Sequence, residues 1–428
     1  DREKIAATWR RSSRPPAASL ALYLHIPFCR RRCLYCGCHT STGWDGSRLE
    51  TYHRCLVKEI GLASSLLAPE RKVEQIALGG GTPNVLDDAL MTGLMDAIRA
   101  SFDVDRQCEI SIELDPRSLE EERVDFLAAA GFNRFSLGVQ DFDPLVQKNV
   151  GRVQPEEKVR RLVDRFRKQG ARAINFDLIY GLPGQTLDSF EKTIGSVIDI
   201  SPSRIAVFGY AHVPWMHAHQ KAMEGKGFPS AEERAALVEM TAEKLTGAGY
   251  IHIGLDHFAR EDDELAAAAR ERRLHRNFMG YTTIKGLRLA AMGASAISAI
   301  DDAYAQDDKD IDGYMKEILD AGVIPWKRGF HLSLDDAIRR DLVMELFCNL
   351  RVDLQALERR YDIKAADYFS AELEKLAAME KDGLLHVDGD AAGIELTEVG
   401  RHFVRNACMV FDRYLAADAG KRVHSKTI

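Results

Sequence analysis

Over its first half, the chain alternates short runs of apolar and β-branched residues with longer runs that carry apolar residues at helical spacing. Short runs of this kind are typical of buried strands, and the longer ones of amphipathic helices. Their alternation predicts a parallel α/β sheet, and six such units fit an incomplete barrel. The predicted strands are Leu20–Ile26, Gln75–Gly79, Glu109–Leu114, Arg134–Val139, Ala173–Leu178 and Arg204–Phe208. The predicted helices between them are Arg48–Leu67, Ala89–Phe102, Leu119–Ala130, Glu156–Gln169 and Leu187–Ile198.

The second half of the chain follows a different pattern. A helix at Ala231–Ala248 and a strand at Tyr250–Leu255 could extend the sheet by one element, and after Asp301 the runs become helical and charged. The elements predicted there are helices at Ile311–Ala321, Leu334–Asn349, Leu354–Tyr361, Ala365–Asp382 and Glu398–Ala416, with a strand pair at Leu384–Val387 and Gly393–Leu396. Their order resembles a winged-helix-like module, whose helices we expect to cap the barrel mouth. The predicted division is an N-terminal arm over 1–19, a barrel with its extension over 20–300 and a mostly helical domain over 301–428.

Composition narrows the class of protein. A length of 428 residues suggests one large domain and one smaller one, and 46% hydrophobic with 29% charged residues is ordinary for a soluble protein. No apolar run approaches the ~18 residues of a membrane span, and the net charge of -7 gives no support for nucleic-acid binding. Eight cysteines, four of them clustered, favour reduced thiols and a metal site over disulfides. We therefore expect a cytoplasmic protein without a membrane or nucleic-acid partner.

The strongest chemical signal is a loop of cysteines directly after the first predicted strand. It contains Cys29, Cys33, Cys36 and Cys38. Three thiolates at the C-x3-C-x2-C spacing can ligate three irons of a cubane cluster and leave the fourth iron open to a small molecule. A structural zinc site is the alternative, but such sites usually pair two separated knuckles rather than occupy one loop. The sequence therefore favours an iron–sulfur cluster with one catalytic position.

Glycines and polar residues follow the other predicted strands, where the loops of parallel α/β folds converge on one mouth. The run from Gly79 to Gly81 lacks the Lys-Ser/Thr of a phosphate loop, so it favours close backbone approach to an amino-acid-like ligand, with a tight turn as the alternative. The polar residues at or just beyond the ends of later strands are Glu113, Asp115, Gln140, Arg152 and Asp177. Such side chains can hydrogen-bond an amino group, a ribose and a carboxylate. Each one alone is more often a cap or turn residue, so the prediction depends on their repetition at strand ends.

Two further groups have ordinary explanations. His212, His217 and His219 include an H-x-H pair that can chelate zinc, but no carboxylate stands at ligand spacing, so we expect two of the three to lie on a polar helix face. The run from Arg30 to Arg32 in the cysteine loop can attract an anionic substrate or an electron donor, or can be a solvated charged stretch. The sequence favours neither interpretation of the arginine run.

Together, these residues resemble the radical S-adenosylmethionine superfamily and, within it, the oxygen-independent coproporphyrinogen III oxidases, also called dehydrogenases. The resemblance runs from about Leu20 to the end of the sequence. Its motifs are Tyr23-Leu-His-Ile-Pro-Phe-Cys29, Cys36-Gly-Cys38, Gly79-Gly-Gly-Thr-Pro, Glu113-Leu-Asp-Pro, Gly138-Val-Gln-Asp141, Asp177-Leu-Ile-Tyr-Gly-Leu-Pro183, Gly254-Leu-Asp-His-Phe-Ala259 and His275-Arg-Asn-Phe-Met-Gly-Tyr-Thr-Thr283. The cysteine spacing marks the superfamily, while Cys38 and the 275–283 run mark the family. This resemblance implies a partial (βα)6 barrel with a mostly helical C-terminal domain.

The resemblance also implies an enzyme of haem biosynthesis. Such an enzyme oxidatively decarboxylates two propionates of coproporphyrinogen III to vinyl groups and gives protoporphyrinogen IX without oxygen. A reduced [4Fe-4S] cluster would cleave S-adenosylmethionine to methionine and a 5'-deoxyadenosyl radical, which would take a hydrogen from the β-carbon of a propionate. The implied partners are the porphyrinogen, an unidentified electron donor and an unidentified electron acceptor, and we expect a monomer.

The resemblance assigns roles to particular residues. Cys29, Cys33 and Cys36 would ligate the cluster, and Cys38 would not. The residues around the S-adenosylmethionine on the cluster would be Tyr23, Gly80, Gly81, Thr82, Glu113, Gln140, Arg152, Asp177, Ala211 and Ile297. Phe278 and Met279 would contact a second S-adenosylmethionine. The family leads us to expect glutamine at Met279, and a thioether cannot replace the donors of an amide, so that side-chain bond is expected to be lost.

The substrate needs cationic partners for its propionates, because arginine and carboxylate pair well. The arginines that flank the 275–283 run are Arg260, Arg272, Arg273 and Arg276. Each of them alone is more often an exposed surface residue, so none is assigned. The family also carries an N-terminal arm rich in Arg, Tyr and Ser that is thought to reach the substrate, and we expect residues 1–19 to be only part of it.

Two rival functions keep part of this chemistry. A radical methyltransferase or a haem-degrading relative would share the cysteine loop and differ in its product. A haem-binding chaperone of the same superfamily would bind the cluster without decarboxylation. Cys38 and the intact His275–Thr283 run disfavour the chaperone, because those chaperones lack the Cys-Gly-Cys ending.

Overall fold

The computed structural model describes residues 2–11, 19–67, 71–388 and 392–415. The chain forms two compact units, of which the first contains residues 1–248 and 286–331 and the second contains residues 249–285 and 332–428. This division differs from the predicted boundary after residue 300. The segment directly beyond that boundary still adds strands to the first unit, while residues 249–285 group with the C-terminal helices.

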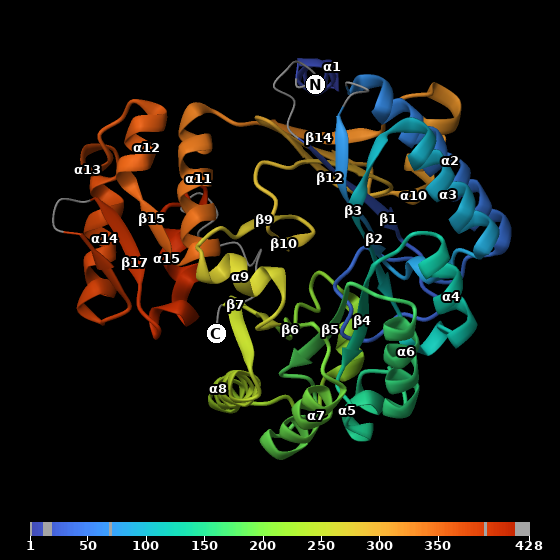
Figure 1. Ribbon diagram of the computed structural model, residues 1–428, viewed down its shortest axis with the longest axis horizontal. Helices are drawn as coiled ribbons and strands as arrows, with labels where there is room; N and C mark the ends of the chain where they lie inside the picture. The colour runs from blue at the N-terminus through green and yellow to red at the C-terminus, as the bar shows by residue number, and fades with distance from the viewer. Residues whose placement is uncertain (1, 12–18, 68–70, 389–391, 416–428) are drawn as a thin grey trace. The chain divides into compact units, whose positions relative to one another are not determined.

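The first unit is built on a sheet that contains six parallel strands, as the apolar runs predict (Figure 1). These strands are β1 (Leu20–Ile26), β2 (Lys72–Gly80), β3 (Asp103–Leu114), β4 (Arg134–Gln140), β5 (Ala173–Tyr180) and β6 (Arg204–Gly209). Each predicted strand lies within an observed one, and neighbouring strands pair in chain order. β1 is buried at six of its seven positions, as expected of a parallel strand covered on both faces.

Four further strands widen this sheet beyond β1, and the sequence does not predict them. They are β11 (Arg288–Met292), β12 (Ile297–Ile300), β13 (Ala303–Asp307) and β14 (Trp326–His331). β11 runs parallel to β1, and the next three strands follow in antiparallel pairs. The expectation of helical structure directly after Asp301 is therefore wrong. β13 and β14 are short and contain few β-branched residues, so they lack the composition that indicates a strand.

Helices connect the parallel strands and lie outside the sheet (Figure 1). The helices of this unit are α1 (Arg2–Arg11), α2 (Gly46–Leu66), α3 (Asp88–Ser101), α4 (Glu121–Ala129), α5 (Pro144–Asn149), α6 (Glu156–Lys168), α7 (Leu187–Ile200), α8 (Ala231–Gly247) and α10 (Ile311–Lys316), with short helical turns at η1 (Pro83–Val85), η2 (Pro116–Ser118), η3 (Ala218–Met223) and η4 (Glu317–Ala321). α2 begins where the Asp45 carboxylate accepts the Arg48 N–H at 2.8 Å, which satisfies a donor that the helix leaves open. The helices predicted here are confirmed to within a few residues.

The second unit is mostly helical, as predicted. Its helices are α9 (Glu264–Arg270), α11 (Leu334–Asn349), α12 (Leu354–Tyr361), α13 (Ala365–Tyr368), α14 (Ser370–Lys381) and α15 (Val404–Val410), preceded by η5 (Gly400–Phe403). Its strands are β7 (Tyr250–Gly254) paired with β8 (His257–Arg260), β9 (His275–Asn277) paired with β10 (Gly280–Thr282), and a sheet in the order β15 (Arg351–Asp353), β17 (Gly393–Leu396), β16 (Leu385–Val387).

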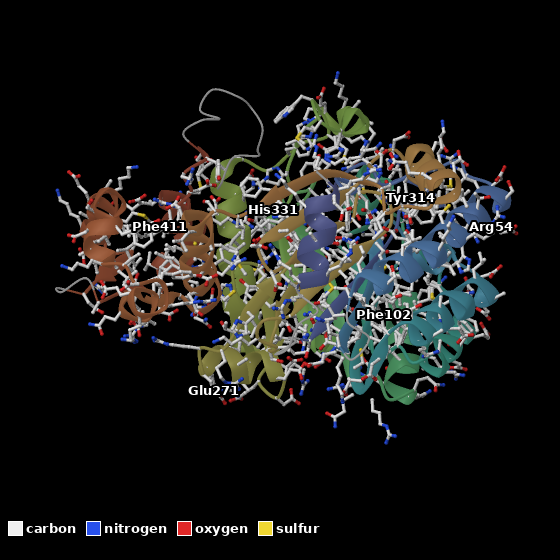
Figure 2. All side chains as sticks on the ribbon, turned by 90° about the horizontal axis from the view of Figure 1, so that it is seen from above. Arg54, Phe102, Glu271, Tyr314, His331 and Phe411 are labelled. Atoms are coloured by element: carbon white, nitrogen blue, oxygen red, sulfur yellow. The ribbon has the colours of Figure 1, made fainter. Side chains whose placement is uncertain are left out.

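Two predicted helices of the second unit differ from the observed ones. Phe369 is fully buried against Phe411, which Figure 2 labels, and it separates α13 from α14 where a single helix is predicted. The last predicted helix is observed as η5 and α15, and its final residue, Ala416, lies outside the described residues. No helix among the described residues has the length and apolar character needed to cross a membrane.

The carboxyl ends of the parallel strands lie at one edge of the first unit's sheet. β11 also ends there, since it runs parallel to β1. The chain then turns at residues 293–296 and returns as β12, so Ile297 stands at this edge too. This geometry gathers the loops that carry most of the predicted site residues.

Candidate functional site

The loop after β1 carries the four cysteines and is tied to the segment that follows β2. Within the loop, the Cys29 N–H donates to the Ser41 carbonyl at 3.0 Å. The Thr82 N–H donates to the Phe28 carbonyl at 2.9 Å, and the Thr82 hydroxyl lies 3.2 Å from the Cys29 sulfur. The glycine-rich segment after β2 therefore fixes the position of the first cysteine.

Cys33 is buried, and two arginines point at its sulfur. One guanidinium nitrogen of Arg117 and one of Arg152 each donate to Cys33 Sγ at 3.3 Å. Asp115 lies 2.7 Å from Arg117 and 3.3 Å from Arg152, and so holds both guanidinium groups. Cationic donors stabilise a thiolate, which is the form of cysteine that binds metals. Arg117 is a further site residue that the sequence does not predict, and the one feature that points to it is its place two residues after Asp115.

Residues of η3 hold the middle of the cysteine loop. His219 Nε2 lies 2.8 Å from the Cys36 carbonyl oxygen, and the Gln220 amide donates to the Tyr35 carbonyl at 3.1 Å. His219 is half-buried and supports the loop. At the end of the loop, a hydrogen bond from the Cys38 thiol lowers the pKa of Cys36.

The three predicted ligands supply the donor set of a cluster. Among the described residues, no three His, Cys, Asp or Glu side chains are gathered closely enough to chelate a single metal ion. A cubane cluster needs its ligand side chains to lie farther apart than a single ion does, because each of its three thiolates binds a different iron. Cys29, Cys33 and Cys36 share one loop, and the sulfur of Cys33 faces two cationic donors, so the residues fit a three-thiolate cluster.

The glycines at the end of β2 allow two side chains to approach the backbone closely. A Cβ atom on Gly79 would stand 2.6 Å from Glu113 Oε1, and one on Gly80 would stand 2.5 Å from His25 Cε1. Gly80 also has a φ of +112°, which L side chains rarely adopt. Its N–H donates to Glu113 Oε2 at 3.1 Å. The glycine run is therefore more than a tight turn.

Glu113, at the end of β3, and Asp177, on β5, form what we call the open acidic pair. Burial, and secondly the charge of Asp177, raise the pKa of Glu113 to about 7, while the Gly80 N–H lowers it. Burial also raises the pKa of Asp177, against hydrogen bonds from Ser136 at 2.8 Å and Asn175 at 2.9 Å. Yet the Glu113 side chain remains exposed and that of Asp177 is only half-buried. Carboxylates that are surrounded by protein without being packed against it are expected to face a ligand.

Gln140 and Arg152 meet at the carboxyl end of β4. Gln140 has a φ of +65°, and strained backbone of this kind is concentrated at functional sites. Arg152 is buried and donates to the Gly138 carbonyl at 2.6 Å. A Cβ atom on Gly138 would stand 2.8 Å from the Gln140 amide and 2.9 Å from the Arg152 guanidinium. The structure thus brings two predicted site residues together over one glycine.

The first unit also contains the other residues predicted around the first S-adenosylmethionine. Tyr23 lies on β1 with its hydroxyl 3.1 Å from His25 Nδ1, and burial raises its pKa. Ala211 lies two residues after the end of β6, and Ile297 is the first residue of β12. Both of these residues are half-buried. Their positions near the carboxyl edge agree with the predicted site.

Phe278 and Met279, predicted to contact a second S-adenosylmethionine, lie in the second unit. They form the turn between β9 and β10, where the Phe278 side chain is 62% exposed. The Met279 N–H donates to the Asn277 side chain at 2.8 Å. An exposed aromatic ring at the tip of a hairpin suits contact with a ligand, and the role of the two residues stays a prediction.

The four arginines near this hairpin differ in their partners. Three form ion pairs with carboxylates; these are Arg260, Arg272 and Arg273. Arg276 instead stacks on Tyr281 and Phe347, with ring distances of 5.0 and 5.1 Å. Its Nη1 atom has no hydrogen-bond partner among the described residues. Arg276 therefore differs from the other three in being held by aromatic rings, while its charge acts on Asp256.

Comparison with known proteins assigns the class. Residues 23–197 match the Radical SAM superfamily, and residues 332–403 match the HemN C-terminal domain. The fold and the cysteine loop are those of a Radical SAM protein, as the sequence predicts.

Relatives over the whole chain narrow the class to a family. The chain is 44% identical over 416 residues to the oxygen-independent coproporphyrinogen III oxidase of Escherichia coli (strain K12), a match that covers 97% of this chain and 90% of the relative. The enzyme of the same description from Salmonella typhimurium is 43% identical over 423 residues, which cover 99% and 92%. The solved coproporphyrinogen III oxidase (HemN) from Escherichia coli, a Radical SAM enzyme, matches with a TM-score of 0.92 at 43% identity over 96% of this chain and 93% of that one. The chain belongs to the family of oxygen-independent coproporphyrinogen III oxidases.

Proposed function

We propose that the protein oxidatively decarboxylates two propionates of coproporphyrinogen III to vinyl groups, giving protoporphyrinogen IX without molecular oxygen. The observation that carries this proposal is the 44% identity to such an oxidase over 97% of the chain. The cysteine loop at the carboxyl edge of the sheet supports it. The rival functions, a radical methyltransferase, a haem-degrading enzyme and a haem chaperone, have no comparable support.

The cysteine loop would hold a [4Fe-4S] cluster through Cys29, Cys33 and Cys36. Arg117 and Arg152 would stabilise the thiolate of Cys33 through their hydrogen bonds to its sulfur. With S-adenosylmethionine bound, the cluster supplies a carbon-centred radical that removes a hydrogen atom from the substrate. The task of the chain is to bind and orient both molecules and to exclude water from them.

The open acidic pair supports binding of S-adenosylmethionine, because that molecule carries a sulfonium and an ammonium group. Carboxylates are strong hydrogen-bond acceptors for such cations. Gly80 allows the His25 ring to pack on its backbone, and its N–H donates to Glu113 Oε2, which orients that carboxylate. The residues that would complete this site are Tyr23, Gly81, Thr82, Gln140, Arg152, Ala211 and Ile297. Phe278 and Met279 would contact a second S-adenosylmethionine. The Met279 thioether would not supply the amide donors of the glutamine that the family leads us to expect at this position.

Arg276 is our candidate for holding a propionate of the substrate. Its guanidinium is oriented by two aromatic rings, and its buried Nη1 atom has no hydrogen-bond partner among the described residues. Bidentate pairing with a carboxylate is the usual role of such an arginine. The further partners are a one-electron donor and a terminal electron acceptor. Action as a monomer and a cytoplasmic location stay predictions.

Product analysis tests the proposed function. The protein is reconstituted with iron and sulfide without oxygen, mixed with coproporphyrinogen III, S-adenosylmethionine and a reductant, and the products are identified by mass spectrometry. We expect 5'-deoxyadenosine together with a porphyrinogen that has lost two carboxyl groups. Finding neither product would overturn the proposal. Deoxyadenosine without decarboxylation would favour the methyltransferase or haem-degrading alternative, and tight stoichiometric haem binding without a vinyl product would favour the chaperone.

A further inference from the structure

A second pair of acidic side chains lies in the core of the first unit, between α2 and β13. Glu59, on α2, is fully buried, and Asp307, the last residue of β13, is 1% exposed. The two carboxyl groups contact each other, and burial raises the pKa of both. We call these two residues the sealed acidic pair.

The surroundings of the sealed acidic pair indicate that it shares a proton. Two carboxyl groups in contact within a core cannot both be ionised at low cost. The Oε2 atom of Glu59 accepts the N–H of Gly293 at 2.8 Å and the hydroxyl of Tyr314 at 2.6 Å. The oxygens left without a donor are Glu59 Oε1 and both oxygens of Asp307. A protonated Asp307 that donates to Glu59 Oε1 gives a partner to that oxygen and to one oxygen of Asp307.

Nearby charges also favour the protonated form. The acidic groups of Asp308 and Glu317 raise the pKa of Asp307 further. Tyr314, labelled in Figure 2, lies on α10 and donates to the pair from one side. Tyr52 lies on α2, seven residues before Glu59. Its ring centroid lies 5.2 Å from that of Tyr314. The groups that act on the pair are thus acidic side chains, a tyrosine hydroxyl and a backbone N–H, none of which takes the proton from it.

The sealed acidic pair holds the turn that links β11 to β12. Glu59 binds the N–H of Gly293 at the start of the turn, and the N–H of Asp307 donates to the Ala296 carbonyl at 3.0 Å at its end. Gly293 has a φ of +104°. A Cβ atom there would stand 2.5 Å from the His25 carbonyl oxygen, so the turn packs closely against β1 at His25.

Tyr52 joins this turn to the segment that leads into the cysteine loop. Its hydroxyl accepts the Ala294 N–H at 2.9 Å and donates to the His25 carbonyl at 2.7 Å. The turn continues into Ile297, and the His25 ring packs on Gly80. Both ends of the network thus reach residues assigned to the cofactor.

We propose that Glu59 and Asp307 are positioning residues, which share one proton and thereby hold the 293–296 turn and the His25 segment in place for S-adenosylmethionine. Neither residue needs to touch the ligand. This inference rests on the proposed function, since it concerns the cofactor of that reaction.

The test compares two substitutions at Asp307 in the reconstituted protein. Asp307→Asn keeps the shape and a donor toward Glu59, while Asp307→Leu removes both the donor and the proton. With 5'-deoxyadenosine formation as the readout, we expect Asp307→Leu to raise KM for S-adenosylmethionine about tenfold with kcat changed by less than about twofold. Asp307→Asn should keep both constants within about twofold of those of the unchanged protein.

Two controls separate positioning from loss of stability. Leu245→Ala, at a fully buried position on α8, lowers stability outside the network and should leave KM unchanged. Tyr52→Phe removes only the bridging hydroxyl and should raise KM about threefold, so the idea stays testable if Asp307→Leu does not fold. Faster hydrogen exchange of the amides at 293 and 294 should accompany both network variants and requires no turnover.

The outcomes distinguish this inference from the proposed function. If the unchanged protein forms no deoxyadenosine, the proposed function fails, and amide exchange still reports on the turn. The positioning role is overturned if the protein is active and a folded Asp307→Leu or Tyr52→Phe variant keeps its KM. It is also overturned if Asp307→Asn is as defective as Asp307→Leu, or if Leu245→Ala raises KM equally.

Discussion

The first unit contains two pairs of acidic side chains that are alike in chemistry and different in surroundings. In the open acidic pair, Glu113 stays exposed at the carboxyl edge of the sheet. In the sealed acidic pair, Glu59 and Asp307 are closed off from solvent and contact each other. Burial raises the pKa of all four groups. A raised pKa alone therefore does not identify a binding site.

What separates the pairs is the means by which each offsets the cost of burial. The sealed pair keeps a proton and receives donors from Tyr314 and Gly293, so its charges are already balanced within the chain. Glu113 receives one backbone N–H from Gly80 and has open surface beside it. A cationic ligand would complete that partnership. We therefore propose ligand binding for the open pair and positioning for the sealed pair.

The largest effect should come from Cys33→Ser, which removes a ligand from the cluster beside the open pair. A hydroxyl is a far weaker iron ligand than a thiolate, so we expect loss of the cluster and no detectable deoxyadenosine. Iron content and visible absorbance after reconstitution check this. Cys408→Ser, at a buried cysteine of the second unit, is the matched control and should keep the cluster. A Cys33→Ser protein with full iron content and activity would contradict the assignment.

Glu113→Gln should weaken S-adenosylmethionine binding by about 10- to 100-fold, because a charge-assisted hydrogen bond is lost. The same variant should be more stable than the unchanged protein at about pH 8 without ligand. The sign follows from the raised pKa of Glu113. As the pH rises above the pKa that Glu113 has in the unfolded chain, ionisation of its buried carboxyl group begins to lower the stability, and the whole loss is present above about pH 7. Equilibrium dialysis and thermal unfolding measure the two effects. Unchanged affinity would argue that the open pair faces no ligand.

Affinity for S-adenosylmethionine should decrease as the pH is lowered, and the open acidic pair alone should cause this decrease. Glu113 has a pKa of about 7 and loses its negative charge below that value, so binding should weaken by up to about tenfold from about pH 8 to about pH 6. Glu113→Gln should lose this dependence, and Asp307→Asn should retain it. A dependence that disappears in Asp307→Asn instead would reverse the roles given to the two pairs.

The smallest effect on binding is expected at the turn itself. Gly293→Ala forces a Cβ atom against the His25 carbonyl and the Tyr52 hydroxyl at a positive φ, so it should cost about 3 kcal/mol of stability and raise KM a few-fold. Gly61→Ala on α2 meets nothing within 4 Å and should stabilise the protein by about 0.5–1 kcal/mol. Urea unfolding and KM for S-adenosylmethionine compare the two variants. Equal stability of both would show that the turn can move away freely.

The sequence predicts the parallel half of the sheet and the open pair well, for one reason. The strands from β1 to β6 are apolar runs that carry polar or glycine residues at or near their carboxyl ends, so local pattern places Cys29, Glu113 and Asp177 near one edge. β11 to β14 escape prediction because residues such as those of β13, Ala303–Asp307, lack strand composition and depend on pairing for their form.

The supporting residues of the site cannot be predicted from local pattern. Glu59 reaches Gly293 across 234 positions of the chain, and Arg152 reaches Cys33 across 119. No spacing in the sequence encodes such contacts. Met279 is a different case, because only the resemblance to the family shows that a glutamine is expected at this position.

The most direct test of the account is a titration of S-adenosylmethionine into three reconstituted proteins at about pH 8: the unchanged chain, Glu113→Gln and Asp307→Asn. The account predicts tight binding to the unchanged chain, binding to Asp307→Asn within about twofold of it, and a loss of about 10- to 100-fold only in Glu113→Gln. Equal affinities in all three, or a loss in Asp307→Asn alone, would contradict it.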